Sequence, residues 1–124
     1  MFDQFKIMGQ VAALMKDKER LREAGERIKR ELDAVRVDGE AGGGAVRVTV
    51  SGSLVVVGVR LEPAVGAGIG SDDASRAQVE TLIAEATNEA IRRAREEAAR
   101  VIEREADALG LPAIPPEVRK LIGS

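Results

Sequence analysis

The first third of the chain has the hydrophobic periodicity of a single long helix. Between residues 3 and 36, apolar side chains recur at spacings of three, four and seven, and no proline interrupts them. A helix over this segment would be about 50 Å long, which exceeds the width of a domain of this size. We therefore expect the helix to project from the domain or to pack against a second chain. The strictest apolar series repeats every seven residues and consists of Leu14, Leu21, Ile28 and Val35.

The middle third switches to the two-residue alternation of a β-sheet, predicted over residues 37–63. Val46, Val48 and Val50 alternate with polar residues, which indicates a half-buried strand. Gly52-Ser53 then predicts a two-residue hairpin loop, in which the glycine takes the positive φ that a type II′ turn requires. Two or three such strands are not stable alone, so a helix or a partner's sheet must cover their apolar face.

The return strand ends at Pro63 and has an apolar face of its own. A further short strand over residues 35–39 can join the sheet through the turn Gly42-Gly43-Gly44. The triple glycine is also a candidate for close approach of a ligand, but a turn that needs positive φ accounts for it better. The residues expected on the inward face of the return strand are Val55, Val57, Val59 and Leu61.

The last third predicts a loop followed by a second long helix. Residues 64–74 are rich in glycine and are expected to form the loop. Ser71, Asp72 or Asp73 would cap the helix, which is expected over residues 75–109.

The second helix ends in signals that stop a helix, and a proline-rich tail follows it. Gly110 and Pro112 terminate the periodic pattern, and the tail covers residues 111–124. The element order is α-β-β-(β)-α, so we expect one α+β domain over residues 1–110, with a long helix at each end of a small antiparallel sheet. The core stripe of the second helix is rich in alanine and consists of Val79, Leu82, Ile83, Ala86, Ala90, Ala94 and Val101.

The composition removes most enzyme chemistry. The 124 residues include no Cys and no His, which excludes disulfides, the usual metal sites and a Ser-His-Asp triad. Phe2 and Phe5 are the only aromatic residues, so we do not expect bases to stack on aromatic rings. We expect no enzymatic activity, no cofactor, no metal and no small-molecule substrate.

Charge and hydropathy give no indication of a membrane. The net charge is −2 and the pI about 5.3, so no overall basic field attracts the chain to DNA or to anionic lipid. The longest apolar run, residues 54–59, is far shorter than the roughly 20 residues that cross a bilayer, and no signal peptide is recognisable. We expect a cytoplasmic protein in which any nucleic-acid contact comes from a local arrangement of Lys and Arg.

The glycine-rich segment Gly66–Ser71 lies between a strand and a helix, where phosphate-binding loops also lie. A dinucleotide fingerprint would need a third glycine in place of Ser71, a P-loop would need a lysine, and the preceding strand is antiparallel. A linker is therefore the favoured interpretation, with a phosphate cradle as the alternative. The pair Asp72-Asp73 is interpreted as a helix cap in preference to a metal ligand.

One set of basic residues forms a stripe on the first helix. At about 100° per residue, its members fall within a sector about 40° wide beside the apolar series. None has an acidic residue four positions earlier, the favoured order for a helix ion pair, and Lys18 repels Arg22. Basic residues that lie together despite their repulsion favour contact with phosphate groups. The alternative is that the aliphatic parts of these side chains simply cover the neighbouring apolar series. The stripe consists of Lys18, Arg22, Lys29 and Arg36.

Other arginines have an acidic residue at the favoured spacing. Arg27 and Arg30 each follow a glutamate by four positions and are expected to form ordinary solvated ion pairs. A row on the second helix is added to the candidate DNA contacts, although its first two members also follow a glutamate by four. It consists of Arg93, Arg100 and Arg104.

Four blocks of the sequence carry a family resemblance. They are Met1-Phe2 before a helix with Met and Lys, GEAGGGAVRVTVSG at residues 39–52, VGVRLEP at residues 57–63 and LIAEATNEA at residues 82–90. In this order and spacing they resemble the bacterial YbaB/EbfC nucleoid-associated proteins over residues 1 to 110. The chain departs from the family pattern in Glu62, where aspartate is common, in its longer glycine-rich loop and in the arginine-rich second half of its last helix.

The resemblance implies a function as well as a fold. It implies a cytoplasmic homodimer with protruding helices, shaped like tweezers, that binds duplex DNA and associates with the nucleoid. It also implies that the chain is not an enzyme and has no cofactor. An acidic overall composition is common in the family, so the pI is compatible with DNA binding.

Two other functions remain open from the residues alone. One is a protein-interaction or scaffold dimer whose helices bind other proteins, with weak or no DNA binding. The other is a hydrolase that uses Ser and Lys or paired carboxylates. Salt dependence separates DNA binding from the scaffold, because phosphate contacts weaken steeply with salt and apolar contacts do not.

Overall fold

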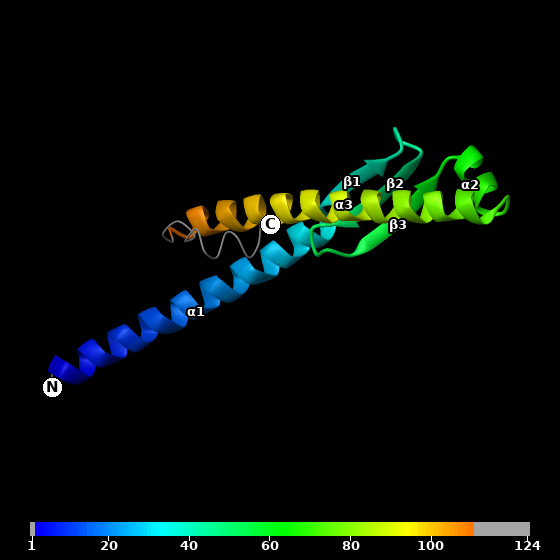
Figure 1. Cartoon of the computed structure of the whole chain (residues 1–124). Helices are drawn as coiled ribbons and strands as arrows, with labels where there is room; N and C mark the ends of the chain where they lie inside the picture. Colours follow the sequence, from blue (N-terminus) through cyan, green and yellow to red (C-terminus); the bar gives the residue numbers. More distant parts are fainter. Residues whose placement is uncertain (1, 111–124) are drawn as a thin grey trace.

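Two long helices and a three-stranded sheet make up residues 2–110, the part of the chain that the structure describes (Figure 1). The structure is a computed structural model. The elements are α1 (Phe2–Ala34), β1 (Arg36–Ala41), β2 (Val46–Ser51), β3 (Val56–Leu61), α2 (Pro63–Ile69) and α3 (Asp73–Ala108). The predicted α+β class and the two long helices are confirmed, while the predicted tail over residues 111–124 lies outside the described residues.

The sheet is an antiparallel meander in the order β1-β2-β3. The third strand that the sequence left open is β1, which pairs with β2 from Arg36 opposite Ser51 to Ala41 opposite Val46. The turn between them contains Gly42, with a φ of 65°, and two further glycines whose φ values are also positive. The triple glycine therefore serves the turn, because side chains other than glycine rarely adopt this backbone conformation.

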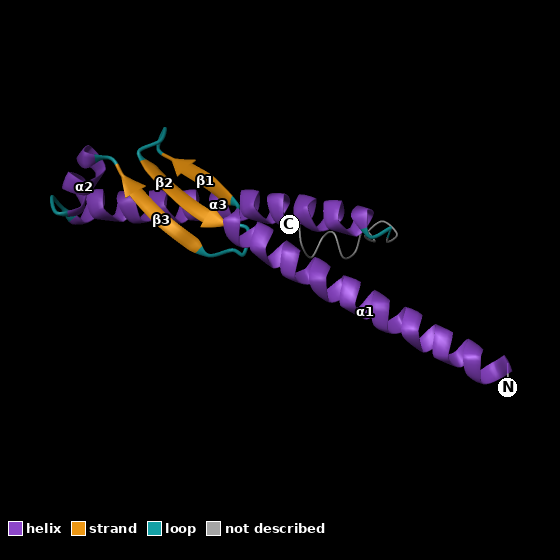
Figure 2. Cartoon of the chain, turned by 180° about the vertical axis from the view of Figure 1, so that it is seen from behind, coloured by secondary structure: helices purple, strands orange, loops and turns teal. Residues whose placement is uncertain are grey.

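Helix α3 covers one face of the sheet and packs on β1 and β2 (Figure 2). Val46, Val48 and Val50 of β2 are fully buried beneath it. The predicted stripe of α3 is confirmed, since its members are buried or half-buried. Its centre consists of alanines, which let the helix lie close to the sheet, and these fully buried residues are Ala86, Ala90 and Ala94.

Gly39 of β1 marks the closest approach of the sheet to α3. A Cβ atom at this position would lie 2.2 Å from the carbonyl oxygen of Ala86 and 2.3 Å from the amide nitrogen of Ala90. Both are backbone atoms, which cannot move away as a flexible side chain can. Glycine is therefore required here by packing, and its φ is not in the positive range.

The hairpin between β2 and β3 differs from the predicted two-residue type II′ loop. The amide of Leu54 donates to the carbonyl of Ser51 at 3.0 Å, and Leu54 itself takes the positive φ, 63°. This is a three-residue loop, in which a β-turn is followed by one left-handed residue. Gly52 has no positive φ; it is needed because a Cβ atom there would lie 2.8 Å from the carbonyl oxygen of Leu32 in α1.

Strand β3 does not have the buried apolar face that the sequence predicted. A register shift between Thr49 and Val50 places Val56, not Val57, opposite Val50. Residues opposite each other in an antiparallel pair point to the same side, so Val56 and Val59 share the α3 side of the sheet with the buried β2 valines. Helix α3 does not extend over them, and about half of each side chain is exposed, 47% and 50%. The prediction of a buried return strand is therefore wrong for the single chain.

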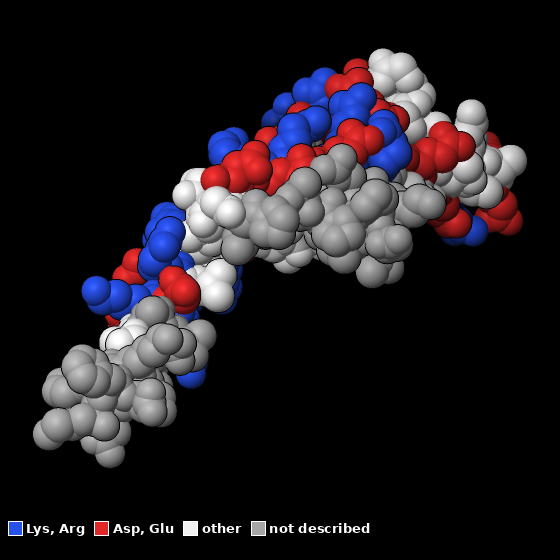
Figure 3. Space-filling model, turned by 90° about the vertical axis from the view of Figure 1, so that its left-hand side faces the viewer, with Lys and Arg blue, Asp and Glu red and all other residues white. Residues whose placement is uncertain are grey.

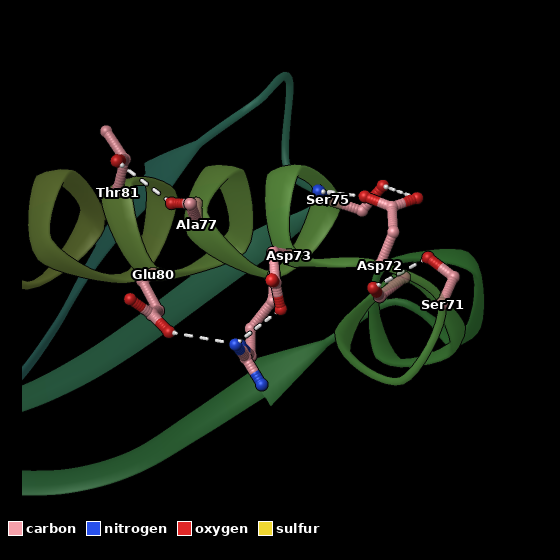
Figure 4. A network of polar contacts seen from close by, with 9 residues as sticks. Ser71, Asp72, Asp73, Ser75, Ala77, Glu80 and Thr81 are labelled. Carbon is pink, nitrogen blue, oxygen red and sulfur yellow. Dashed lines mark hydrogen bonds and ion pairs between the residues drawn. The ribbon is translucent and has the colours of Figure 1, made fainter.

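The segment predicted as a loop over residues 64–74 contains the short helix α2. Pro63 occupies its first turn, where the missing N–H of proline costs nothing. The predicted cap of α3 is Asp72, whose Oδ1 accepts a hydrogen bond from the Ser75 amide at 2.7 Å (Figure 4). This bond, with the one from the Ser75 hydroxyl, holds the pKa of Asp72 below its ordinary value.

Only the C-terminal part of α1 packs against the rest of the chain. Ala24 is buried where α1 meets α3, as are Ala98 and Val101 of α3. Every described side chain before Ala24 is exposed, and this part of α1 points away from α3 (Figure 1). We call residues 2–23 the arm. The predicted projection of the first helix is thus observed.

Candidate nucleic-acid interface

Three of the four stripe residues lie on α1 as predicted. Lys18, Arg22 and Lys29 are exposed, and none of them makes a hydrogen bond or an ion pair with another residue of the described part. Their charges are therefore available to an external anion without loss of an internal contact. Lys18 and Arg22 lie on the arm. Lys29 lies on the later segment of α1, which packs against α3.

Arg36 does not belong to the helical stripe. It is the first residue of β1, because α1 ends at Ala34. Its Nη1 atom donates hydrogen bonds to the carbonyls of Asp33, at 2.6 Å, and Val35, at 2.8 Å. The side chain thus satisfies carbonyls at the end of α1, which no later turn of helix can bond.

The arginine row of α3 is engaged in ion pairs. Arg93 bonds Glu89 at 2.7 Å, as its spacing predicted, and also donates to the carbonyl of Asp38 at 3.0 Å. Arg100 bonds Glu97 at 3.0 Å, three residues earlier and not four. Arg104 reaches across to Glu31 of α1 at 2.9 Å. These arginines contact a phosphate only by giving up or sharing such partners.

Arg27 is not the solvated pair that its spacing predicted. Its Nε atom lies 3.4 Å from Oε2 of Glu105 on α3, and Glu105 is 9% exposed. With Arg104 and Glu31, these residues form a four-membered cluster that joins the two long helices. The hydrogen bond from Arg104, followed by one with Glu105, lowers the pKa of Glu31 from its ordinary value. The cluster holds α1 on α3 at the base of the arm.

An additional basic residue, Lys16, lies on the arm about 160° around the helix from Lys18, at roughly 100° per residue. An open hollow of about 440 Å³ runs along the arm, and the described side chains that line it include Met15, Lys16, Lys18, Glu19 and Arg22. Lys16 is exposed and has no ion pair with another described residue. Sequence reasoning missed it because Lys16 lies outside the sector about 40° wide that defines the stripe.

The alternative phosphate cradle at Gly66–Ser71 is not formed. Most of the segment belongs to α2, and the Ser71 hydroxyl donates back to the carbonyl of Gly68 at 3.0 Å. The linker interpretation is therefore also incomplete, because the segment is largely helical. Asp72 and Asp73 serve the start of α3, where Asp73 pairs with Arg76 at 2.8 Å.

Charges of both signs are interleaved over the visible face in Figure 3, on the body as well as on the arm. No single-sign surface is apparent there, in keeping with the net charge of −2. Within residues 2–110, no group of three or more acidic side chains is arranged to hold a metal ion. None of the described helices is both long and apolar enough to cross a membrane.

The sequence profile of the YbaB/EbfC DNA-binding family matches residues 8–108, which include α1 from residue 8 onward, the whole sheet and α3. The chain belongs to this family. The resemblance stated from the sequence blocks is thereby confirmed. In this YbaB/EbfC chain, the matched region contains the four-membered cluster that joins α1 to α3. It also contains Lys18, Arg22 and Lys29.

Curated relatives of this YbaB/EbfC chain are nucleoid-associated proteins. One, from Lachnoclostridium phytofermentans, is 39% identical over 102 residues, which are 82% of this chain and 82% of the relative. Another, from Pseudomonas fluorescens, is 37% identical over 86 residues, which are 69% of this chain and 75% of the relative.

Proposed function

We propose that the chain is a non-enzymatic protein that binds duplex DNA as a homodimer, mainly through phosphate contacts along α1, and that it associates with the nucleoid in the cytoplasm. The observation that carries the proposal is the difference between the two helices. On α1, Lys18, Arg22 and Lys29 have no acidic partner among the described residues, whereas the arginine row of α3 is paired. Membership of a DNA-binding family and relatives named as nucleoid-associated proteins support it.

A homodimer is supported by apolar surface that one chain leaves exposed. Val56 and Val59 lie on the α3 side of β3 with no helix over them. On the arm, Met15 is 66% exposed and Leu21 53%. A second copy that covers these surfaces would bury them in two equivalent places, as two-fold symmetry requires. A tweezer shape would follow if the two arms diverge from such a dimer.

The phosphate contacts are expected to give position and affinity with little reading of base sequence. Lys and Arg on a helix contact the backbone of any sequence, and the described residues contain no aromatic side chain outside the start of α1. Three cations per chain make six in a dimer, so the log–log salt slope is at most about 5.4, from roughly 0.9 per phosphate.

The test is a double substitution, Lys18→Gln with Arg22→Gln, measured by fluorescence anisotropy on two unrelated duplexes over a series of salt concentrations. Affinity should fall at least about tenfold near 0.1 M salt on both duplexes, and the salt slope should decrease by up to about 3.6 for the four charges removed per dimer. The fold should be unaffected, because removal of a repulsive (i, i+4) pair is neutral or slightly stabilising.

The matched control is Arg76→Gln with Arg92→Gln, which removes the same charge from two exposed ion pairs, at 2.8 Å with Asp73 and 2.7 Å with Glu96. Arg27 is unsuitable as a control, because its loss would leave the buried Glu105 without that partner. Equal effects of the test and control pairs would contradict the assignment to the α1 stripe.

The scaffold dimer is a second candidate, favoured by the exposed Met15 and Leu21 of the arm. It predicts that the wild-type chain shows no salt-sensitive affinity for duplex DNA. Such a result would refute DNA binding and leave the apolar arm as the functional surface.

A further inference from the structure

The face of the sheet that points away from α3 carries a polar hollow of about 280 Å³ that the DNA stripe does not use. It is lined by residues of all three strands. Its floor is Gly58 of β3, which lies opposite Thr49 of β2. The walls are two arginines, Arg47 and Arg60, and on the far side Asp38.

Neither a positive φ nor a close neighbour requires glycine at position 58, which lies beside the register shift of β3. Its φ is not in the positive range, and a Cβ atom built on it would meet nothing within 4 Å. The open space distinguishes it from Gly39 and Gly52, whose missing side chains make room for helix backbone. Glycine inside a strand weakens the strand, and it often marks either a bulge, such as the register shift beside Gly58, or a place where a ligand or another backbone approaches closely. Here it leaves the hollow open to solvent.

The two arginines are held side by side by the register of the sheet. Arg47 and Arg60 lie directly opposite each other on β2 and β3. Like charges in this arrangement are destabilising when no anion lies between them. Arg47 has a partner, Glu40, at 2.6 Å, whereas Arg60 is exposed and makes no hydrogen bond or ion pair with another residue in the described range. One positive charge is thus unmatched at the rim of the hollow.

The carboxylate of Asp38 limits where an anion can lie. It accepts a hydrogen bond from the Thr49 hydroxyl at 2.7 Å. Asp38 belongs to β1, two strands away from Arg60, which corresponds to about 10 Å between the strands. An anion above Gly58 therefore lies beside the arginines and away from this carboxylate.

We propose that the outer face of the sheet binds one phosphate group above Gly58, between Arg47 and Arg60. A phosphate offers oxygens in several directions, so two guanidinium groups from different strands can each contact it. A ligand with a carboxylate group would offer only two oxygens to the two arginines. Arg47 already bonds one carboxylate oxygen, that of Glu40 in the same chain. The phosphate belongs either to the DNA backbone, in which case the inference rests on the proposed function, or to a free phosphate compound.

The first experiment titrates the full-length chain with inorganic phosphate at constant ionic strength and follows the backbone amide resonances of Gly58 and Arg60. Saturable shifts with phosphate and none with chloride are expected. Arg60→Gln and Gly58→Val should each weaken the phosphate affinity at least fivefold. Gly58→Val should melt no lower than the wild type, since its side chain enters open space and valine favours a strand.

The control is Arg92→Gln, which removes one exposed positive charge from α3 and should leave the phosphate shifts unchanged. The proposal is overturned if the wild-type amides do not respond to phosphate, or if Arg60→Gln responds as the wild type does.

The second experiment identifies the source of the phosphate by measuring DNA affinity against salt for Arg60→Gln. A salt slope lower by up to about 1.8 per dimer, from roughly 0.9 per phosphate, assigns the site to the DNA backbone. An unchanged slope with intact wild-type phosphate shifts assigns it to a free phosphate compound. If the wild type does not bind duplex DNA, the proposed function fails, and the phosphate titration still decides the site.

Discussion

Positions without a side chain determine how closely the elements of this chain approach one another. Gly39 lets the sheet contact the backbone of α3, and Gly52 lets the hairpin contact the backbone of α1. Gly25, in contrast, lies within α1, where an added Cβ atom would meet nothing within 4 Å. The same residue type is thus required at two positions and unfavourable at the third.

Gly39→Ala should destabilise the fold, and Gly25→Ala should stabilise it. The added methyl at Gly39 overlaps backbone atoms of α3, which should cost about 1–3 kcal/mol or more in the free energy of unfolding. At Gly25 it meets open space and improves helix propensity by about 0.5–1 kcal/mol. Urea denaturation at one fixed protein concentration measures both. A Gly39→Ala variant as stable as the wild type would show that α3 does not lie so close to β1.

The candidate site could be predicted from the sequence only where partners are local. The spacing of Glu89 and Arg93 gave the correct ion pair, because both residues lie on one turn of helix. The partner of Arg27 is 78 residues away, so no helical spacing could identify Glu105. The unpaired state of Lys18 was indicated by the absence of an acidic residue four positions earlier.

Among the elements, the long helices and the alternation of β2 could be predicted because their periodicity is local. The apolar face of β3 could not, because one shifted residue opposite Val50 changes which valines point toward α3. Helix α2 was missed because its glycines favour a loop, whereas Pro63 starts the helix and Val65 packs against the core. The exposed face of β3 and the formation of α2 thus depend on strand register and on packing, which local periodicity does not show.

The contact between α1 and α3 should weaken in acid because of Glu31. Its pKa lies below the ordinary value of 4.5, chiefly through the hydrogen bond from Arg104. A lowered pKa means that the ionised carboxylate stabilises the folded state above pH 4.5 and that this stabilisation is lost as the pH falls through the lower, folded-state value. Glu31→Gln should therefore be less stable than the wild type near neutral pH and equally stable in acid.

Thermal melting of both proteins from pH 7 down to pH 3 measures the difference. Glu85→Gln, which removes an exposed carboxylate of α3 that has no resolved ion pair, is the control and should differ little from the wild type at any pH. A gap between Glu31→Gln and the wild type that widens in acid would contradict the assigned sign.

At the scale of the whole molecule, two valines that face the same side of the sheet should respond differently to substitution. Val48 is fully buried under α3, so Val48→Asp should prevent folding, because an ionised carboxylate there has no partner. Val56 is half exposed in one chain, so Val56→Asp should fold and lose only the proposed dimer. Circular dichroism measures folding, and light scattering measures mass against the 13.2 kDa of one chain.

The wild type should scatter as twice that mass at micromolar concentration and Val56→Asp as a single chain. A dimeric Val56→Asp variant would place the interface away from β3. A wild type of 13.2 kDa throughout this range would refute the dimer itself.

Because the arm of α1 is held only at its base, small rotations there become large displacements at its tip. Residues 2–23 extend about 33 Å at roughly 1.5 Å per residue. A rotation of about 10° at the base therefore moves the tip by about 6 Å, close to the axial length of two base pairs at roughly 3.4 Å each. In the proposed DNA complex, small adjustments near Ala24 would let the arm follow duplexes of different local curvature, while the sheet and α3 keep their packing.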